Sequence, residues 1–468
     1  MKMSIFSVQD HYPDQPRSLG QLYSQVLEQA RRAEQLSYDT FWVAEHHFHE
    51  YGAVPNPAVF LAALSQQTTR LRLGTAISIL TFHNPLTVAE NYALVDQLSQ
   101  GRLSLGVGSG YLKHEFEGYA VDPATKRERF DENLMLVERL LAGERVSHEG
   151  KFNRIHEVRL NVQPVQQPVP VYVAILRREA AYHVGRQGRR MLFVPYAAVD
   201  NFEEIGLMMQ DYRRGLAEAG IEDATGMAAV ALHTHVAETD DEARERAARA
   251  FDLDVDTRLY ARKQVYDDII ASGLSLFGSP RTVADKLARL ADMGLDHVMS
   301  LHNFGLMPQD LVLDSMQRLM AEAMPLSGVR PASTVPACAA AAGKPHACQR
   351  RSQPASSAPG AGALRHRRHG GDRRGRRRAD RPHGQLLRAR LAGAAAGAVE
   401  PAPRQHPLRR LHHPGRLRHP CAGGAAARPG AGVLATRGGP LCRAGLVCHR
   451  GRHPRVRRLR RPLRVRHP

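Results

Sequence analysis

The sequence predicts an α/β protein whose first 325 residues fold as a (β/α)8 TIM barrel with insertions. Eight short runs of apolar and β-branched residues alternate with stretches whose apolar residues recur at helical spacing. The short runs are apolar throughout instead of alternating with polar residues, which is typical of parallel strands covered by helices. A length near 325 residues fits such a barrel better than an open doubly wound sheet.

The predicted strands are short and are bounded by polar or turn-forming residues. They are the runs MSIFSV (3–8), TFWVA (40–44), LRLGTAISIL (71–80), RLSLGVG (102–108), VPVYVAI (169–175), MLFVPY (191–196), MAAVALHTHVAE (227–238) and DHVMSL (296–301). In a parallel barrel the carboxyl ends of all strands meet at one face, where the active site lies. The residues that follow each run are therefore the candidates for function.

Several predicted helices carry capping residues at their ends. Asn56-Pro57 and Asn84-Pro85 each combine an N-cap side chain with a proline in the first helical turn. Ser279 caps a later helix, and Gly294 ends it. The predicted helical segments are 18–37, 58–68, 86–100, 127–144, 178–188, 201–220, 279–294 and 308–324.

Charge divides the chain after residue 325. Residues 326–468 hold 32 of the 65 Lys and Arg residues but only 3 of the 46 Asp and Glu residues, a net charge of +29. Residues 1–325 carry a net charge of −10 and none of the five cysteines. This part has the composition of an acidic domain without disulfides or a cysteine metal site. We expect no signal peptide or membrane span, and a cytoplasmic location.

The basic segment 326–468 is dominated by Ala, Gly, Pro, Arg and His, as in RHRRHGGDRRGRRR (365–378). Because it lacks Ile, Phe, Tyr, Trp, Asn and Met, it cannot bury enough apolar surface to offset its ordering entropy, and we expect disorder. Basic arms that bind nucleic acid usually mix Lys with Arg, and RNA-binding ones often interleave aromatic residues. We therefore expect no specific nucleic-acid binding. The composition is that of GC-rich DNA translated in a shifted frame.

Histidines gather at the ends of several predicted strands. They are found in EHHFHE (45–50), at His83, at His233 and His235, and in His302-Asn303. Such residues suit acid–base catalysis, or a metal-dependent barrel hydrolase in which His and carboxylate ligands activate water. The metal interpretation comes second, because no carboxylate ends the fifth, sixth or eighth strand. We expect His233 and His235 to be ordinary strand residues, with one of them facing the helices.

Two further features indicate a flat ligand that carries an anionic group. GVGSG (106–110) resembles part of a dinucleotide fingerprint, but no helix is predicted after it to hold a pyrophosphate. Its glycines would instead let a flat ring lie against the strand end. Arg177 and Arg178 precede a predicted helix, where they suit a cofactor phosphate or, equally, two solvated surface charges.

The segment FWVAEHHFHEYGAVPNPAVFLAALSQQTTRLRLGTAISILTFHNPLTVAENYALVDQLSQGRLSLGVGSGY (41–111) closely resembles the bacterial luciferase-like flavin monooxygenases. The resemblance continues through RRMLFVPY (189–196) and GSPRTVADKLARLADMGLDHVMSLHNFG (278–305), and so covers essentially residues 1–325. It implies a barrel that binds reduced FMN at its strand ends. It also implies that O2 oxygenates a small organic substrate, such as an aldehyde, through a flavin C4a-hydroperoxide.

The resemblance also assigns residues to the flavin site. His46 matches the catalytic histidine of the family, which assists proton transfer. The residues matching the strand ends that support the flavin ring, often through a non-prolyl cis peptide at the first of these strands, are Ala76, Ile77, Ser78, Gly108 and Ser109. Gly108 stands where luciferase itself has a cysteine, so we expect no thiol chemistry.

Two departures from the family pattern bear on the cofactor. The phosphate-binding hydroxyl groups of the family are absent after the fifth strand, which leaves Arg177 and Arg178 as substitutes. Glu45-His46-His47 differs from the Asp-His of many deazaflavin-dependent relatives, so we favour FMN, with a deazaflavin-dependent oxidoreductase as an alternative.

In a shifted reading frame the basic segment resembles a second protein. Read from the second base of each codon, with permitted synonymous choices, residues 365–405 can give a string that includes GADGAPIGLTANSF, and residues 439–446 can give DRFAGLDW. These strings resemble the short flavin reductases that supply reduced FMN to two-component monooxygenases. We therefore expect a separate or adjacent flavin reductase as a partner. Because relatives commonly dimerise, we also expect a homodimer.

Overall fold

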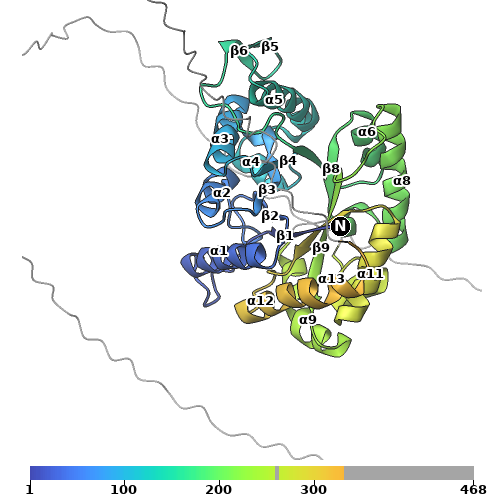
Figure 1. The fold of residues 1–468 in the computed structure, drawn as a ribbon. Helices are drawn as coiled ribbons and strands as arrows, with labels where there is room; N and C mark the ends of the chain where they lie inside the picture. Colours follow the sequence, from blue (N-terminus) through green and yellow to red (C-terminus); the bar gives the residue numbers. More distant parts are fainter. Residues whose placement is uncertain (259–262, 331–468) are drawn as a thin grey trace, which may run out of the picture. The chain divides into compact units, whose positions relative to one another are not determined.

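The structure, a computed structural model, describes residues 1–258 and 263–330. The interpretation of the basic segment beyond residue 330 lies outside the described residues. Eight parallel strands form a closed barrel, which confirms the predicted fold class (Figure 1). They are β1 (Lys2–Ser7), β2 (Thr40–Val43), β3 (Arg72–Ile79), β4 (Leu103–Gly108), β7 (Val171–Ile175), β8 (Arg190–Phe193), β9 (Ala228–Val236) and β11 (His297–Leu301).

The hydrogen-bonded order of the barrel strands is β1-β2-β3-β4-β7-β8-β9-β11, and β11 pairs again with β1. The pairing of β8 with β9 closes the ring, with Met191 opposite Ala228. In this order β7 stands four strands away from β1 in either direction. The ends of β1 and β7 therefore face each other across the barrel.

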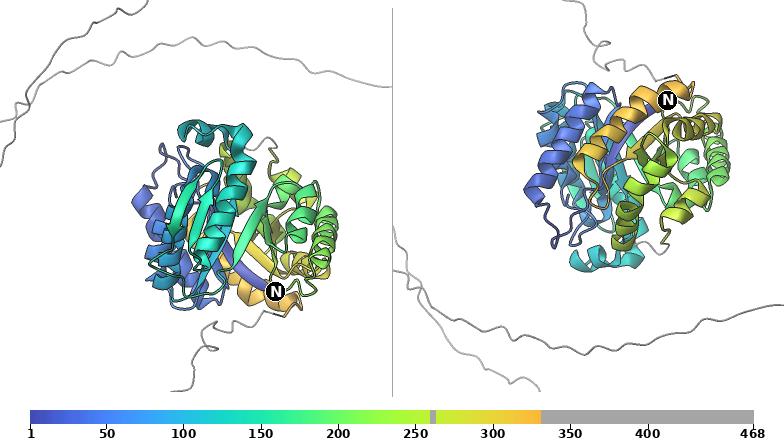
Figure 2. Two further views of the ribbon diagram at one scale, coloured as in Figure 1. Left: turned by 90° about the horizontal axis from the view of Figure 1, so that it is seen from above. Right: turned by 90° about the horizontal axis from the view of Figure 1, so that it is seen from below.

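Helices surround the barrel strands, as the two views of Figure 2 show. They are α1 (Leu19–Gln35), α2 (Pro57–Ser65), α3 (Pro85–Leu98), α4 (Lys113–Gly118), α5 (Lys126–Leu141), α6 (Glu179–Arg186), α7 (Pro195–Ala198), α8 (Phe202–Glu218), α9 (Asp240–Thr257), α10 (Tyr266–Ser272), α11 (Pro280–Asp292), α12 (Gln309–Arg318) and α13 (Met324–Leu326). Among the described residues, no helix combines the length and apolar character needed to cross a membrane.

The predicted capping residues occupy the helix ends. The side chain of Asn56 accepts a hydrogen bond from the backbone N–H of Val59, and Asn84 caps α3 in the same way through Leu86. Ser279 caps α11. Each cap satisfies an N–H group that has no partner inside its helix, which is why these helices begin at these residues.

The structure corrects the sequence-based description in three places. The six-residue helix α4 follows β4, where no helix was expected after the glycines. A short antiparallel pair, β5 (Val146–Glu149) and β6 (Arg154–Val158), interrupts the alternation of strand and helix. The segment 250–277, for which the sequence predicts no helix or strand, contains the end of α9, the helix α10 and part of the strand β10 (Leu276–Gly278). These short elements have too few residues to show a clear periodicity.

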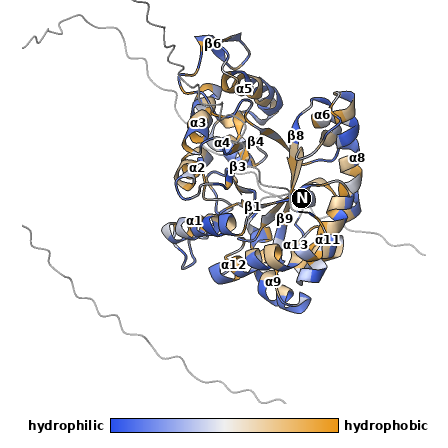
Figure 3. Ribbon diagram, viewed as in Figure 1, coloured by the Kyte–Doolittle hydropathy of each residue, from blue (hydrophilic) through white to orange (hydrophobic). Residues whose placement is uncertain are grey.

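The core follows the hydropathy of the elements (Figure 3). Strand residues are almost all buried, and the helices present apolar residues to the strands, as Leu22 and Val26 do on α1. The fully buried Trp42 of β2 meets Tyr172 of β7 edge to face, with 5.3 Å between ring centroids. This contact joins two strands that are not neighbours in the ring, so side chains fill the barrel interior.

The described chain keeps contact with the barrel beyond residue 325, the predicted end of the domain. The amino group of Met1 donates a hydrogen bond to the carbonyl oxygen of Arg330, and Met324 is buried against the core. We expect a chain that ends at residue 330 to keep the thermal midpoint of the full chain, because residues 331–468 lack core-forming side chains. A chain that ends at 325 should melt slightly lower. Differential scanning calorimetry of both truncations checks this, and a collapse of folding on removal of 331–468 would contradict it.

Candidate active site

A cavity of about 1130 Å³ opens at the carboxyl ends of β1, β2, β3, β4, β7 and β8. Six of the eight sequence-predicted site residues belong to its wall: His46, Ala76, Ile77, Gly108, Ser109 and Arg177. The other two, Ser78 and Arg178, do not line it. The volume exceeds the roughly 300–1,000 Å³ common for small-ligand pockets, so a cofactor and a substrate can be held together.

His46 lies at the end of β2 and is 8% exposed. Its Nδ1 lies 3.2 Å from Oε1 of Glu115 on α4. With Nδ1 engaged by this oxygen, Nε2 is the ring nitrogen left available to a bound reactant. The same Glu115 oxygen also accepts the backbone N–H of His47 at 3.1 Å. Glu115 therefore orients the ring of His46, the candidate catalytic histidine, and the backbone of the residue that follows it.

Close packing holds the His46 ring in place. The ring of Tyr51 lies 4.7 Å from it and that of Tyr111 lies 6.4 Å away at 90°, measured between centroids. A Cβ atom on Gly52 would come within 2.8 Å of His46 Cβ and Cδ2, so only glycine allows this approach. A rigid ring with one engaged nitrogen is the arrangement that an acid–base group requires.

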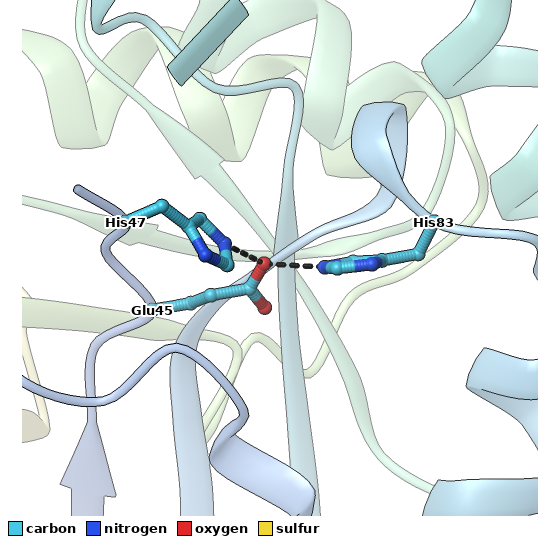
Figure 4. Close-up of side chains that lie close together, drawn as sticks. All are labelled: Glu45, His47 and His83. Atoms are coloured by element: carbon cyan, nitrogen blue, oxygen red, sulfur yellow. Dashed lines mark hydrogen bonds and ion pairs between the residues drawn. The ribbon is translucent and has the colours of Figure 1, made fainter. Parts of the chain in front are cut away.

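The neighbouring Glu45 is the centre of a buried hydrogen-bonded cluster (Figure 4). Its Oε1 lies 3.0 Å from Nε2 of His47 and 2.6 Å from Nε2 of His83. Its Oε2 accepts from the hydroxyl of Ser78 and from the backbone N–H of Ile79, each at 3.2 Å. Glu45 thus ties the end of β2 to the end of β3.

Hydrogen bonding decides the charge of this cluster. Burial alone would raise the pKa of Glu45, but the hydrogen bonds from His47 and His83 outweigh it and lower the pKa to about 2. Burial lowers the pKa of His83, but the hydrogen bond to Glu45 and its charge raise it above the usual value. Glu45 is therefore an anion across the physiological pH range.

The ends of β3 and β4 form a small-residue surface beside this cluster. The Ala76–Ile77 peptide bond is cis, as expected for the matching strand end. A Cβ on Gly108 would lie 2.2 Å from Cδ1 of Ile77, so a larger residue there would displace the Ile77 side chain. Ser78 turns away from the cavity to Glu45. The backbone of Ser109 is held by the Thr81 hydroxyl, which donates to its carbonyl oxygen at 3.0 Å.

The two candidate anion-binding arginines differ in their surroundings. Arg177 lines the cavity and has no recorded ion pair within the described part of the chain. Arg178 instead reaches α8, where its Nε and Nη2 lie 3.2 and 3.1 Å from Oδ2 of Asp211. Only Arg177 is therefore placed to meet a bound anion.

The histidines on β9 and after β11 do not reach the cavity. His233 lies 3.2 Å from Asp254 of α9, and His302 bonds Ser315 of α12 at 2.8 Å. His235 is buried, with Arg246 of α9 among its charged neighbours. His233 bonds α9, and strand residues two apart share a face, so His235 lies on the same face as His233. The expectation that only one of the two faces the helices is therefore wrong.

The metal interpretation finds one candidate group among the described residues, Glu45 with His47 and His83. Their ligand atoms lie within 4.8 Å of one another. Both histidine nitrogens are already directed at a single carboxylate oxygen at hydrogen-bonding distance, and neither histidine lines the cavity. The geometry is that of a hydrogen-bonded cluster behind the cavity wall.

Sequence reasoning missed Glu115, Tyr51 and Tyr111 as parts of the site. Glu115 lies in KHEFEG, which shows no helical periodicity, so nothing indicated that a helix would turn its carboxylate towards His46. The positions of both tyrosines depend on loops after β2 and β4. A signal was present in Glu115 itself, since a carboxylate close in sequence to a glycine-rich strand end is a candidate partner for a nearby histidine.

Comparison with known proteins agrees with this geometry. Residues 1–297 match the family model described as luciferase-like monooxygenase. A monooxygenase from Streptomyces bottropensis of known structure is 29% identical, with a TM-score of 0.65 over 69% of this chain and 99% of that chain. The oxygenase component of a flavin-dependent trigonelline monooxygenase from Acinetobacter baylyi is 27% identical over 251 residues, 53% of this chain and 68% of that protein.

One further similarity concerns the cofactor. An F420-dependent glucose-6-phosphate dehydrogenase from Amycolatopsis mediterranei is 32% identical over 170 residues, 35% of this chain and 51% of that protein. Several curated relatives are matched over only about half of their length, two of them over 52% and 57%. The family model, in contrast, matches well over half of this chain. The chain therefore belongs to the luciferase-like monooxygenase family.

Proposed function

We propose that the protein is the oxygenase of a two-component system, which uses reduced FMN and O2 to oxygenate a small organic substrate. The observation that carries the proposal is the His46–Glu115 pair on the wall of a cavity large enough for cofactor and substrate together. Reduced FMN, when bound, supplies the electrons that activate O2. The chain's own residues bind and orient the reactants, exclude water and move a proton at Nε2 of His46.

The residues present fit a flavin. Ala76, Gly108 and Ala174 are small residues at the ends of β3, β4 and β7, and the side chain of Ile77 packs over Gly108, so a flat ring would lie against this apolar surface. The cationic Arg177 stands at the end of β7, next to α6, where a ring attached to a phosphate chain would end. One side of the cavity therefore offers an apolar surface to the flavin ring and a cation to its phosphate.

Anaerobic titration with reduced FMN tests the proposal, with reduced deazaflavin as the parallel arm. Saturable binding of reduced FMN, followed by O2-dependent product formation, supports it. Tight binding of the deazaflavin with no binding of reduced FMN would overturn it in favour of a deazaflavin-dependent oxidoreductase. The metal-dependent hydrolase is tested in the same preparation, since activity that a chelator abolishes would support it.

The partner is proposed to be a separate flavin reductase. We expect the purified protein to turn over when reduced FMN is supplied and to oxidise NADH or NADPH at no more than the rate of free flavin. The physical reason is that α4, the helix after the glycine-rich strand end, has six residues and no side-chain cap, so it offers no dinucleotide site. Steady NADH consumption by the pure protein, followed at 340 nm, would count against a reductase partner.

Arg177 is proposed to hold the cofactor phosphate. Arg177→Ala should raise the dissociation constant of reduced FMN about 10- to 100-fold, the effect of losing one charge-assisted hydrogen bond. Arg178→Ala is the matched control, because that side chain is already paired with Asp211 and does not line the cavity. Equal effects of the two substitutions on the dissociation constant would remove Arg177 from this role.

The homodimer also remains a proposal. Large apolar side chains on the packed helices α2 and α3 are exposed, with exposed fractions of 67% for Val59, 49% for Leu94 and 42% for Leu98. Sedimentation equilibrium of the wild-type chain and of the Leu94→Glu variant checks whether this face joins two copies. A wild-type monomer at micromolar concentration would exclude a stable dimer.

A further inference from the structure

The cationic side chains of the cavity and most of its aromatic side chains come from different elements, although α5 also contributes Phe130 and Asp131 to the wall. Its cationic residues come from α5, from the end of β7 and from the segment around α6, and they are Lys126, Arg127, Arg177 and Arg189. A second group of wall residues comes from the ends of β1 and β2, from the loops after β2 and β4, and from the end of β8, which neighbours β7 in the ring. Its aromatic and aliphatic residues, here called the aromatic arc, are Phe6, Val8, Tyr51, Tyr111, Phe193 and Tyr196.

His46 belongs to the side of the aromatic arc. Its ring is in contact with Tyr51, and Tyr111 stands perpendicular to it. Phe6 and Val8 belong to the end of β1, which lies across the ring of strands from β7 and therefore from Arg177. A flavin that lies over β3, β4 and β7 leaves this arc as the space next to the acid–base group.

Among the described residues, no cation belongs to the aromatic arc. The guanidinium of Arg258 lies 4.1 Å from the ring of Tyr196, but Arg258 is fully buried and does not line the cavity. The charged groups close to His46 are carboxylates, Glu45 and Glu115. An anionic substrate would thus meet no counter-charge there and would face the carboxylate of Glu45.

A cationic substrate has no free carboxylate on this side either. Both oxygens of Glu45 already accept hydrogen bonds, from His47, His83, Ser78 and Ile79. Glu115 is fully buried behind His46, and one of its oxygens is bonded to that ring. The surface that remains is made of aromatic rings, three of them carrying a tyrosine hydroxyl, and aliphatic groups, and such ring faces bury flat apolar ligands well.

We propose that the substrate is a neutral, largely apolar molecule built on a ring system, bound in the aromatic arc next to His46. The inference rests on the proposed function, because it assumes that the flavin occupies the side of β3, β4 and β7. It narrows the proposed substrate class from any small organic molecule to ring compounds. Ring ketones and ring aldehydes should therefore bind more tightly than straight-chain aldehydes of similar size. With the anionic form of reduced FMN, the balanced reaction joins this substrate, O2 and one proton to give oxidised FMN, the oxygenated substrate and water.

The test compares four probes on the full chain in complex with reduced FMN, without O2, by equilibrium dialysis. The probes are 2-acetylnaphthalene, 2-naphthoate, 2-naphthylmethylammonium and n-decanal. We expect 2-acetylnaphthalene to bind at least about 10-fold more tightly than either charged analogue, because each charge would be desolvated without a partner. It should also bind more tightly than n-decanal. Equal or tighter binding of a charged naphthalene would overturn the neutral class, and tighter binding of decanal would overturn the ring class.

Two substitutions examine the arc itself. Val8→Lys should make 2-naphthoate bind more tightly than 2-acetylnaphthalene. Ala180→Lys, on the side of α6, should leave the order of the two affinities unchanged. If Val8→Lys fails to fold, Phe6→Leu serves instead, and it should weaken 2-acetylnaphthalene about 3- to 10-fold. An unchanged preference in Val8→Lys, or unchanged binding in Phe6→Leu, would remove the arc from substrate binding. Failure of the proposed function looks different, because reduced FMN itself would then not bind.

Discussion

His46→Ala should bind reduced FMN nearly as well as the wild type while product formation falls about 10²- to 10⁴-fold, the usual effect of a positioned acid–base group. The ring lines the cavity, its Nδ1 is engaged by Glu115, and its Nε2 is left for a reactant. Without that proton donor and acceptor, we expect the O2 consumed to appear as hydrogen peroxide instead of product. Single-turnover product yield and peroxide release, measured in the same samples, check this.

His47→Ala is the neighbouring control for this prediction. His47 is buried, its Nε2 is directed at Glu45 and its Nδ1 lies 3.2 Å from the hydroxyl of Tyr119, so it does not reach the cavity. Its replacement should lower the free energy of unfolding and change the amount of product formed per O2 consumed only slightly. If His46→Ala is stable and its coupling is unchanged, the catalytic assignment is wrong. If His46→Ala loses stability and activity together, packing explains the loss instead.

Replacement of Glu115 separates positioning from chemistry. Glu115→Gln keeps one oxygen for the backbone N–H of His47 but removes the charge that orients the His46 ring. We expect turnover to fall less than in His46→Ala, because the His46 ring stays in the cavity wall but is held less firmly. Steady-state kinetics of both variants check this, and turnover equal to that of the wild type would limit Glu115 to a structural role.

The fold could be predicted from the sequence because its signals are local and repeated. Eight apolar strands and the caps at Asn56, Asn84 and Ser279 each follow from a few adjacent residues. His46 could be placed at a strand end for the same reason. Glu115 could not, because its meeting with His46 depends on a short helix 69 residues further along the chain.

The two arginines show a second limit of sequence reasoning. Arg177 and Arg178 are adjacent and identical in type, and both precede the same helix, so nothing local distinguishes them. The distinction comes from Asp211 on α8, which pairs with Arg178 and not with Arg177. Long-range charge pairing of this kind is set by how α6 packs on α8, which spacing along the chain does not encode.

A group of buried histidines makes the folded protein sensitive to acid. Burial, and then the charge of Arg246, lower the pKa of His235 to about 4, while burial and the neighbouring His235 lower that of His302 to about 3. Burial also lowers the pKa of His233 and His297. Since an unfolded histidine titrates near 6.5, the unfolded chain binds more protons than the folded one below that pH. Stability is therefore complete above pH 6.5 and is lost as the pH falls towards 4.

Two carboxyl groups modify this dependence without reversing it. Burial and the nearby Asp254 raise the pKa of Asp10 to about 6, so the folded state gains a proton there between pH 6 and 4, which opposes the loss. Glu45, with its pKa lowered to about 2, adds a further loss below about pH 4.5. Asp10 thus offsets the loss of stability on acidification that about one of the histidines causes.

The free energy of unfolding should therefore fall on acidification by about 1.4 kcal/mol per pH unit for each histidine that must stay neutral. His235→Leu should reduce this slope by up to one proton and leave stability at pH 7.5 unchanged or higher. The reason is that neither nitrogen of His235 has a hydrogen-bond partner in the described part of the chain. His156→Leu, at an exposed position on β6, is the matched control and should leave the slope unchanged. Urea unfolding between pH 5 and 8 measures all three slopes, and equal slopes for wild type and His235→Leu would show that His235 does not contribute to acid sensitivity.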